Sequence, residues 1–399
     1  MTKKAMQVVV LKEKEGKGKM ESFLKQQENA MLHFIEELVN IDSGSYDKQG
    51  VDKIGEILIS HYKELGFQIE VEKQEEFGNH LLIQHRDAID PQIIILAHMD
   101  TVFPVGTAAE RPFSIKDDRA YGPGVIDMKS SHASLLYAIK ALMHEGLIGY
   151  KDIKIVINSD EEIGSPSSKC MIEREAKGKK YALVMEPARK DGSLVSARRG
   201  KGNYTLIVEG RAAHSGIEPE KGRSAIEELA HKILQLYELS DHENGISVNV
   251  GLIEGGSSAN TVSDHAEAQI DIRIKEMDQV EYLEERLEEI CASTEVSGTK
   301  VLLEGEMNRP PMEKNKKTRA LLRIIQDVGE EIGIEIEDTS TGGGSDASFT
   351  SSLGIATIDG LGPVGGNAHS DKEYLEIPTL VERTLLLALL IERLSHRTK

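Results

Sequence analysis

The chain has 399 residues, which is more than one ordinary hydrophobic core accommodates, so two or three domains are expected. Its 67 acidic residues outnumber 48 basic ones and leave a net charge of -19, which disfavours binding to nucleic acid or to an anionic membrane surface. The two cysteines, Cys170 and Cys291, lie far apart and form no CxxC pattern. This usage favours a reducing compartment over a disulfide-stabilised protein, and we expect a cytoplasmic location.

The first 20 residues contain a basic start and a short apolar run that ends at Leu11. A charged segment, residues 12–19, follows the run without a small-residue cleavage site, so the pattern does not fit a signal peptide. We interpret residues 1–20 as an irregular lead-in. No later stretch approaches the roughly 18 consecutive apolar residues that a membrane-spanning helix needs.

Short β-rich runs alternate with helical patterns after the lead-in, which is typical of βαβ units on a mostly parallel sheet. The apolar residues of the segment 135–143 fall on one face of a helix, which should pack on that sheet. Ser130 or Ser131 is expected to cap the start of this helix, and Gly146 to close its end. The expected strands are residues 93–97, 153–157 and 181–185.

The pattern changes between about residue 200 and residue 310. The expected order is strand, helix, strand, strand, helix, strand, which is the split βαβ or ferredoxin-like arrangement. The strand at 266–274 alternates strictly between apolar and polar residues, so one face should be buried and the other, with Arg273, should face solvent. The other expected elements are strands at 203–208, 246–253 and 300–303 and helices at 224–239 and 280–291.

The α/β pattern returns after Pro310 and Pro311, with a helix at 318–332, a strand at 355–358 and a final helix at 378–394. The simplest architecture is therefore one α/β domain with helices on both faces of a mostly parallel sheet, interrupted by an inserted α+β lid domain. We expect the first to consist of residues 21–199 and 311–399, and the second of residues 200–310.

Residues of types that can bind metals follow the expected strands. They lie at the edge where an α/β sheet places its active site. His98 follows the first strand, and Asp100 is near enough in sequence to orient its imidazole. Glu161 and Glu162 follow the second strand, and Glu186 follows the third.

Two further residues of this kind lie beside glycine-rich loops. Asp127 stands just before a helix, and His369 follows the strand at 355–358. Two histidines and three carboxylates suit zinc, manganese or cobalt and are too hard a ligand set for copper(I) or iron–sulfur chemistry. Taken alone, each piece has an ordinary explanation as a polar pair, a solvated turn or a tight turn. Their shared position at strand ends, in this order, is what indicates a site.

The order and spacing of these segments resemble the zinc metallopeptidase family that includes the folate-hydrolysing glutamate carboxypeptidases, acetylornithine deacetylase, succinyl-diaminopimelate desuccinylase and aminoacylase. The resemblance extends from about Glu21 to the C-terminus, and the glutamate carboxypeptidases are the most similar branch. The segments that resemble the family are Ala97-His-Met-Asp-Thr-Val102, Gly122-Pro-Gly-Val-Ile-Asp-Met-Lys129, Asp160-Glu-Glu-Ile-Gly164, Met185-Glu-Pro187, Ala213-His-Ser-Gly216, Gly342-Gly-Gly-Ser-Asp346 and His369-Ser-Asp371.

The resemblance implies two zinc ions per subunit, for which cobalt or manganese could substitute. His98, Asp127 and Glu186 would hold one ion. Asp127, Glu162 and His369 would hold the other, so that Asp127 bridges the pair. A bridging carboxylate suits this role because it can hold two ions about 3.5–4 Å apart.

The resemblance also implies roles for residues that do not bind metal. Glu161 would be the general base, and Asp100 would orient the ring of His98. His214, in the lid, would stabilise the oxyanion in the active site of the partner subunit, which requires a homodimer. Considered from the sequence alone, a histidine at such a turn has a structural explanation.

Three lid positions, Asn260, Arg273 and Arg309, match residues that surround the substrate carboxylates in the carboxypeptidases. The fork of an arginine suits such groups, although surface ion pairs remain the alternative for both arginines and a hinge role for Arg309. His132, His231, His242 and His265 match no ligand position and are expected to be ordinary surface or core residues.

Two features depart from the pattern of the carboxypeptidases. Met128 stands where a second aspartate is frequent, and Ser130 and Ser131 replace the usual glycines. Methionine occurs at this position in other branches, so the metal site is still expected, but the substrate class is left more open.

Three functions remain to be compared. The first is a metallocarboxypeptidase that releases a C-terminal acidic residue, with glutamate preferred, from a small peptide. The second is an N-acyl amino acid deacylase or desuccinylase with the same chemistry. The third is a non-catalytic metal-binding protein, against which the intact Glu161 argues, because loss of catalysis would first relax the selection of a base.

Overall fold

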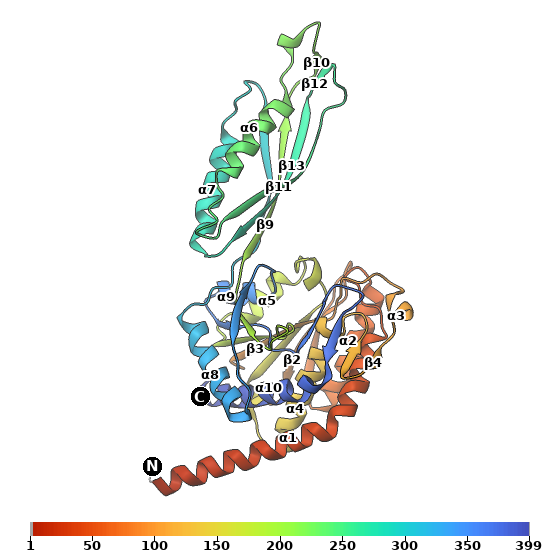
Figure 1. Ribbon diagram of the computed structural model, residues 1–399, viewed down its shortest axis with the longest axis vertical. Coiled ribbons are helices and arrows are strands. Elements are labelled where there is room, and N and C mark those ends of the chain that lie inside the picture. Colours follow the sequence, from red (N-terminus) through yellow and green to blue (C-terminus); the bar gives the residue numbers. More distant parts are fainter. Residues whose placement is uncertain (1–2, 399) are drawn as a thin grey trace. The chain divides into compact units, whose positions relative to one another are not determined.

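The computed structural model describes residues 3–398, which fall into two compact units (Figure 1). The first unit consists of Met1–Ser196, Lys314–Ser340 and Ser345–Lys399, and the second of Ala197–Glu313 and Thr341–Gly344. These bounds lie within a few residues of the boundaries expected at 199/200 and 310/311. The observed division differs from the expected one in the short segment Thr341–Gly344. This segment belongs to the second unit, although the expected lid domain ends at residue 310.

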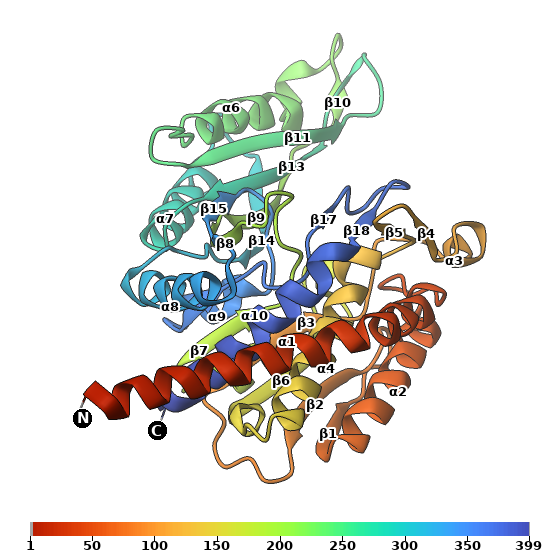
Figure 2. The same ribbon diagram turned by 60° about the horizontal axis from the view of Figure 1, so that its bottom comes forward.

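A six-stranded mixed sheet lies in the core of the first unit (Figure 2). β3 pairs in parallel with both β6 and β7, and β16 extends the parallel part beyond β7. β2 is antiparallel to both of its neighbours, β1 and β6. Every residue of β3 is buried, so the sheet is covered on both faces there, as predicted. In spatial order the strands are β1 (Phe67–Glu72), β2 (His80–His85), β6 (Ile153–Asn158), β3 (Ile93–His98), β7 (Tyr181–Val184) and β16 (Ala356–Ile358).

Three long helices pack together beside this sheet. α4 (Ser130–His144) packs against α10 (Ile377–Thr398), and α10 also contacts β3. α1 (Lys3–Val39) lies across both helices, as Figure 2 shows. The other helices of this unit are α2 (Lys48–Glu64), which packs on β1 and β2, α8 (Lys316–Ile332), which packs on β16 and α10, α9 (Ala347–Ser352), which packs on β7 and β16, α5 (Lys169–Ala176), which packs on α9, and the short α3 (Thr107–Glu110).

Shorter elements complete the first unit. β17 (Gly365–Gly366), β18 (Tyr374–Glu376), β5 (Arg119–Tyr121) and β4 (Ser114–Lys116) form a small antiparallel sheet in this order. Short helical turns are η1 (Val125–Lys129), η2 (Gly149–Asp152) and η3 (Glu161–Ile163). The chain passes between the two units at four points. Two of them fall within β8 (Leu194–Arg198) and β15 (Asp338–Thr341), which pair with each other.

The second unit contains a four-stranded antiparallel sheet packed against two helices. The main elements follow in the order βαββαβ, so the ferredoxin-like arrangement predicted from the sequence is confirmed. The apolar residues of β13 are buried and alternate with less buried polar ones, as predicted. In chain order the elements are β9 (Gly200–Glu209), β10 (Ala213–His214), η4 (Pro219–Lys221), α6 (Ala225–Tyr237), β11 (Ser247–Gly255), β12 (Thr261–Val262), β13 (His265–Ile274), α7 (Asp278–Ala292) and β14 (Lys300–Arg309).

The prediction of an irregular lead-in at residues 1–20 is wrong, because α1 already begins at Lys3. Lysine, glutamate, glutamine and methionine dominate this stretch and have high helix propensity. Gly16 and Gly18 each cost about 1 kcal/mol in a helix interior. That cost is offset because α1 buries an apolar face from Met20 and Leu24 onward.

The predicted cap of α4 is also wrong, although the predicted end is confirmed. No side chain caps the start of α4, because the chain enters it from η1 with a helical backbone at Lys129. The hydroxyl of Ser131 instead donates to the backbone oxygen of Met185 at 2.6 Å. Gly146 adopts a φ of +68°, a left-handed conformation that suits a helix end.

None of the helices within residues 3–398 combines the length and hydropathy that a membrane span requires.

Candidate metal centre

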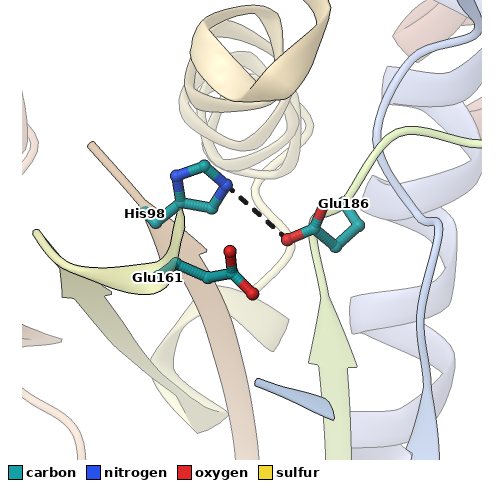
Figure 3. A group of neighbouring side chains, drawn as sticks. All are labelled: His98, Glu161 and Glu186. Atoms are coloured by element: carbon teal, nitrogen blue, oxygen red, sulfur yellow. Dashed lines mark ion pairs between the residues drawn. The ribbon is translucent and has the colours of Figure 1, made fainter. Parts of the chain in front are cut away.

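Three neighbouring parallel strands bring predicted ligands to one edge of the sheet. His98 is the last residue of β3, Glu161 and Glu162 lie in η3 just after β6, and Glu186 follows β7. Because β6, β3 and β7 are adjacent and parallel, their carboxyl ends lie together. Figure 3 shows the ring of His98 facing the carboxylate of Glu186. The side chain of Glu161 extends into the same space.

Asp127, in η1, faces two histidines with different oxygens. Its Oδ1 lies 3.2 Å from Nε2 of His98, and its Oδ2 lies 3.2 Å from Nε2 of His369. A second carboxylate approaches each imidazole, with Glu186 Oε1 at 3.6 Å from His98 Nε2 and Glu162 Oε2 at 3.1 Å from His369 Nε2. The five residues therefore form two groups that share Asp127.

The distances within each group fit two metal ions. Donor atoms bound to one tetrahedral zinc ion at about 2.0–2.1 Å lie roughly 3.3 Å apart, which is the separation found between imidazole nitrogens and carboxylate oxygens at this site. Oε1 of Glu162 is buried and has no hydrogen-bond partner among the described residues. A buried acceptor of this kind requires a cation or a water molecule. The donor set and its geometry are thus those of a dinuclear site for zinc or a similar divalent ion.

The same groups hold protons strongly when no cation is bound. Hydrogen bonds with Asp127 and Glu162 raise the pKa of His369 to about 11. Burial lowers the pKa of His98, but hydrogen bonds with Asp100 and Asp127 raise it by more than burial lowers it. The net pKa of His98 therefore lies well above the ordinary value. Burial also raises the pKa of Glu186 well above its usual range. Metal ions must displace these protons, because imidazole and carboxylate ligands bind in their deprotonated forms.

Asp100 contacts both His98 and the turn that holds the two adjacent glutamates. Its backbone oxygen lies 2.9 Å from Nδ1 of His98, which leaves Nε2 directed at the site. Its carboxylate lies 3.4 Å from the same Nδ1 and also accepts the backbone N–H groups of Glu161 and Glu162, each at 3.1 Å. The hydroxyl of Ser45 donates to this carboxylate at 2.7 Å. Asp100 therefore fixes the η3 turn, a contact that the sequence did not indicate.

Glu373 is a second residue that the sequence analysis missed. Its buried carboxylate accepts the backbone N–H groups of Gly124, Ile126 and Asp127 at 2.9–3.0 Å. Burial raises the pKa of this carboxyl to about 7, and the three donated hydrogen bonds oppose that rise. Glu373 follows His369 by four positions, but no sequence pattern indicates that it contacts a loop some 250 residues away.

His132 is buried behind the site and does not belong to either ligand group. Its Nε2 lies 2.8 Å from the backbone oxygen of His98, and burial lowers its pKa to about 4. It is therefore a neutral core histidine that supports the strand end, in line with the expectation that it is no ligand.

In the second unit, the structure brings His214 and Asn260 together. β10 pairs with β12 so that His214 lies opposite Thr261, and the backbone oxygen of Asn260 accepts the N–H of Ser215. His214 is exposed, and its Nδ1 accepts the N–H of Gly216 at 3.1 Å. This contact places the proton of a neutral imidazole on Nε2, which is then a hydrogen-bond donor.

Three arginines of the second unit surround its triglycine segment, Gly342–Gly344. Arg273 pairs with Asp271 on its own strand and donates to the backbone oxygen of Gly342 at 3.2 Å. Arg198, which the sequence analysis did not single out, donates to the backbone oxygen of Gly343 at 2.9 Å.

Arg309 is buried and packs directly against Gly344, where an added Cβ would lie 2.8 Å from its Cδ. A larger residue at position 344 would therefore force the side chain of Arg309 to shift. The two predicted arginines therefore lie on the same short segment as Arg198.

Comparison with known proteins identifies the protein class. The profile of peptidase family M20/M25/M40 matches residues 94–393. The chain belongs to this family. It is 29% identical over 370 residues to carboxypeptidase G2 of Pseudomonas sp. (strain RS-16), covering 91% of this chain and 88% of that protein. It is 26% identical over 363 residues to succinyl-diaminopimelate desuccinylase of Dechloromonas aromatica (strain RCB), covering 85% of this chain and 92% of that protein.

Solved structures show the same fold. A tripeptidase from Staphylococcus aureus subsp. aureus mu50 superposes with a TM-score of 0.75 at 23% identity, covering 92% of this chain and 99% of that chain. Membership of the M20 family makes the protein a metallohydrolase. The histidines and carboxylates around His98 and Asp127 form a possible dinuclear metal site in this metal-dependent family member. The resemblance noted from the sequence is confirmed.

Proposed function

We propose that this M20 enzyme is a two-zinc carboxypeptidase that hydrolyses the amide bond next to a C-terminal acidic residue, with glutamate preferred. The observation that carries the proposal is the arrangement of Asp127, whose two oxygens face the Nε2 atoms of His98 and His369 at the same distance of 3.2 Å. A carboxylate in this position would be able to hold two ions, one at each oxygen. Two ions in one site suit amide hydrolysis better than a structural metal, because structural zinc sites are single and closed.

In the proposed enzyme, His98, Asp127 and Glu186 hold one ion, and Asp127, Glu162 and His369 hold the other. When bound, the two ions supply Lewis acidity, which polarises the scissile carbonyl and lowers the pKa of water to about 7.

Glu161 takes the proton of the attacking water and delivers it to the leaving nitrogen. One oxygen of its carboxylate, one ring nitrogen of His98 and one oxygen of Glu186 all lie within 4.8 Å of one another. Asp100 holds its backbone N–H, so the base stays aimed at the space in front of His98.

We further propose that two copies associate through the second unit. β11 is an edge strand of its sheet, and its residues Leu252 and Ile253 are each 60% exposed. On the adjacent α6, Leu234 and Tyr237 are exposed as well. An apolar sheet edge of this kind is a ready partner for a second strand, and pairing with a second copy would cover it. His214 of one copy would then donate from Nε2 to the oxyanion in the other copy.

Asn260, Arg273 and Arg309 are proposed to bind the carboxylates of the substrate. Carboxypeptidase G2, at 29% identity, supports the carboxypeptidase function. Succinyl-diaminopimelate desuccinylase, at 26%, supports the alternative of an N-acyl amino acid deacylase or desuccinylase. The chemistry at the metal centre is the same in both, and only the groups flanking the amide differ.

A substrate panel separates the two functions. The zinc-loaded protein is assayed with acyl-glutamates, dipeptides with C-terminal glutamate or alanine, and N-acetyl and N-succinyl amino acids. The proposal expects the highest kcat/KM on acyl or peptidyl glutamates. Preference for acetyl or succinyl groups regardless of the amino acid would favour the deacylase, and no hydrolysis of any amide would contradict both.

A further inference from the structure

Glu373 lies beside the metal centre but in neither group of potential metal ligands. It follows the loop that holds His369 and precedes β18. The residue is 1% exposed, and its carboxylate contacts the loop before α4. Oε1 accepts the N–H groups of Ile126 at 2.9 Å and of Asp127 at 3.0 Å, while Oε2 accepts the N–H of Gly124 at 3.0 Å.

These three N–H groups converge because the loop bends sharply at Gly124. The residue has a φ of +72°, a left-handed conformation that favours glycine, and an added Cβ would lie 2.6 Å from the side chain of Thr101. The bend turns the amides of residues 124, 126 and 127 toward the same point in the interior. A carboxylate suits this point because its two oxygens accept several hydrogen bonds at once and make stronger bonds than a neutral acceptor.

The contact joins two segments that each contribute a ligand. The amide of Asp127 itself is bound to Glu373, and the side chain of Asp127 meets His369 at 3.2 Å. His369 has a φ of +63°, in the left-handed region that few residues other than glycine adopt. Both ligands are therefore placed relative to one carboxylate, over a separation of 242 residues in sequence between Asp127 and His369.

We propose that Glu373 is a positioning residue that sets the bridging carboxylate of Asp127 against His369. This inference rests on the proposed dinuclear centre. A positioning role differs from simple stabilisation of a buried loop. If Glu373 positions Asp127, its replacement changes the coordination of the ion held by Asp127, Glu162 and His369 even when the variant protein is folded.

The test compares Glu373→Gln with Glu376→Gln. Glutamine has the size of glutamate but only one acceptor oxygen. It therefore cannot accept all three hydrogen bonds in the same geometry, and its amide NH2 group faces the remaining N–H donors. Glu376 is a matched control three positions later, where the carboxylate is paired with Arg119 at 2.6 Å and is part of no ligand group. Metal-free forms of the wild type and of both variants are titrated with cobalt(II), by calorimetry and by visible absorption, and their thermal unfolding is followed.

We expect the wild type and Glu376→Gln to bind two cobalt ions with the same spectra. Glu373→Gln should bind one of the two ions roughly 10–100-fold more weakly, the usual scale for residues that orient ligands, and its cobalt spectrum should change. The inference is overturned if Glu373→Gln binds both ions with wild-type affinity and spectrum, whether or not its melting temperature falls. If Glu373→Gln does not fold, Glu373→Asp, which retains the charge on a shorter side chain, takes its place with the same expectations. A wild type that binds fewer than two ions would instead contradict the dinuclear centre.

Discussion

Asp127 is the residue on which the centre depends, because its oxygens face two different histidines. The groups around it determine where those oxygens point. Asp100 holds the turn with Glu161 and Glu162, and Glu373 holds the loop with Asp127. Most of these contacts are to backbone N–H groups, so the fold, rather than the ligands themselves, prepares the site.

Replacement of Glu161 with glutamine should lower kcat by about 100- to 10,000-fold, because glutamine cannot take up a proton. Metal content should stay at the wild-type value, since the proposed role of Glu161 concerns the proton and not an ion. Turnover on an acyl-glutamate and metal analysis by mass spectrometry check the two statements. Wild-type turnover, or loss of an ion, would show that Glu161 has another role.

Zinc binding should release protons at about pH 7. Because the pKa of His369 is about 11 without metal, its imidazole is protonated at neutral pH and must lose that proton to bind zinc. Protons compete less as the pH rises, so affinity should increase between about pH 6 and pH 8. Calorimetry in buffers of different ionisation enthalpy measures the release. An enthalpy that does not depend on the buffer, or an affinity that falls with pH, would refute this prediction.

At the scale of elements, the paired strands β10 and β12 determine how His214 is presented. The two short strands bring His214 next to Asn260 on an exposed hairpin, with Nε2 free of the contact that Nδ1 makes to Gly216. The edge strand β11 presents Leu252 and Ile253 on the same unit. These features support a histidine that acts in a partner subunit.

His214→Ala should reduce turnover roughly 100-fold or more without changing metal content, the usual scale for loss of one oxyanion donor. The two single variants, His214→Ala and Glu161→Gln, are then mixed under conditions of subunit exchange. If His214 acts across the interface, one site of each mixed dimer contains both intact residues, so part of the activity returns. A monomer in solution, or no recovery after demonstrated exchange, would exclude this arrangement.

At the scale of the whole molecule, a net charge of -19 opposes the approach of a substrate with free carboxylates. Local cations must offset that repulsion. Arg198, Arg273 and Arg309 around Gly342–Gly344 are a concentration of such charge within the second unit.

Arg309→Ala should lower kcat/KM for substrates with a free α-carboxylate by at least about 30-fold, because a lost charge contact of this kind costs on the order of 2–5 kcal/mol. Arg273→Ala should have a smaller effect, since Asp271 already pairs with its guanidinium. The matching carboxamides should change little. Arg286→Ala removes an exposed charge elsewhere in the same unit and serves as the control. Equal losses on acids and amides would assign Arg309 a structural role.

Local patterns in the sequence determined much of the fold. Alternation in β13 and the βαββαβ order depend on residues close together in the chain, so periodicity alone was sufficient to predict them. For α4 periodicity predicted the helix but not its surroundings, because the structure buries nearly all of its residues, including Ser134, and not one apolar face alone. The same reasoning failed for residues 3–20, because helix propensity and the packing of Met20 and Leu24 outweighed two glycines. The sequence also placed His98, Glu162 and Glu186, the proposed ligands, after strands that the structure shows to be adjacent.

Only the tertiary structure decided how those residues meet. The opposite oxygens of Asp127, the contact of Asp100 with the η3 turn and the contact of Glu373 with the loop at Gly124 join segments that are far apart in sequence. The same holds for Arg198 and the triglycine segment. Such contacts depend on the order of strands in the sheet and on the packing of the loops beyond it. The periodicity of a sequence does not encode that order, so the residues that support the proposed ligands could not be predicted. The proposed ligands could be predicted because each directly follows a strand or a glycine-rich loop.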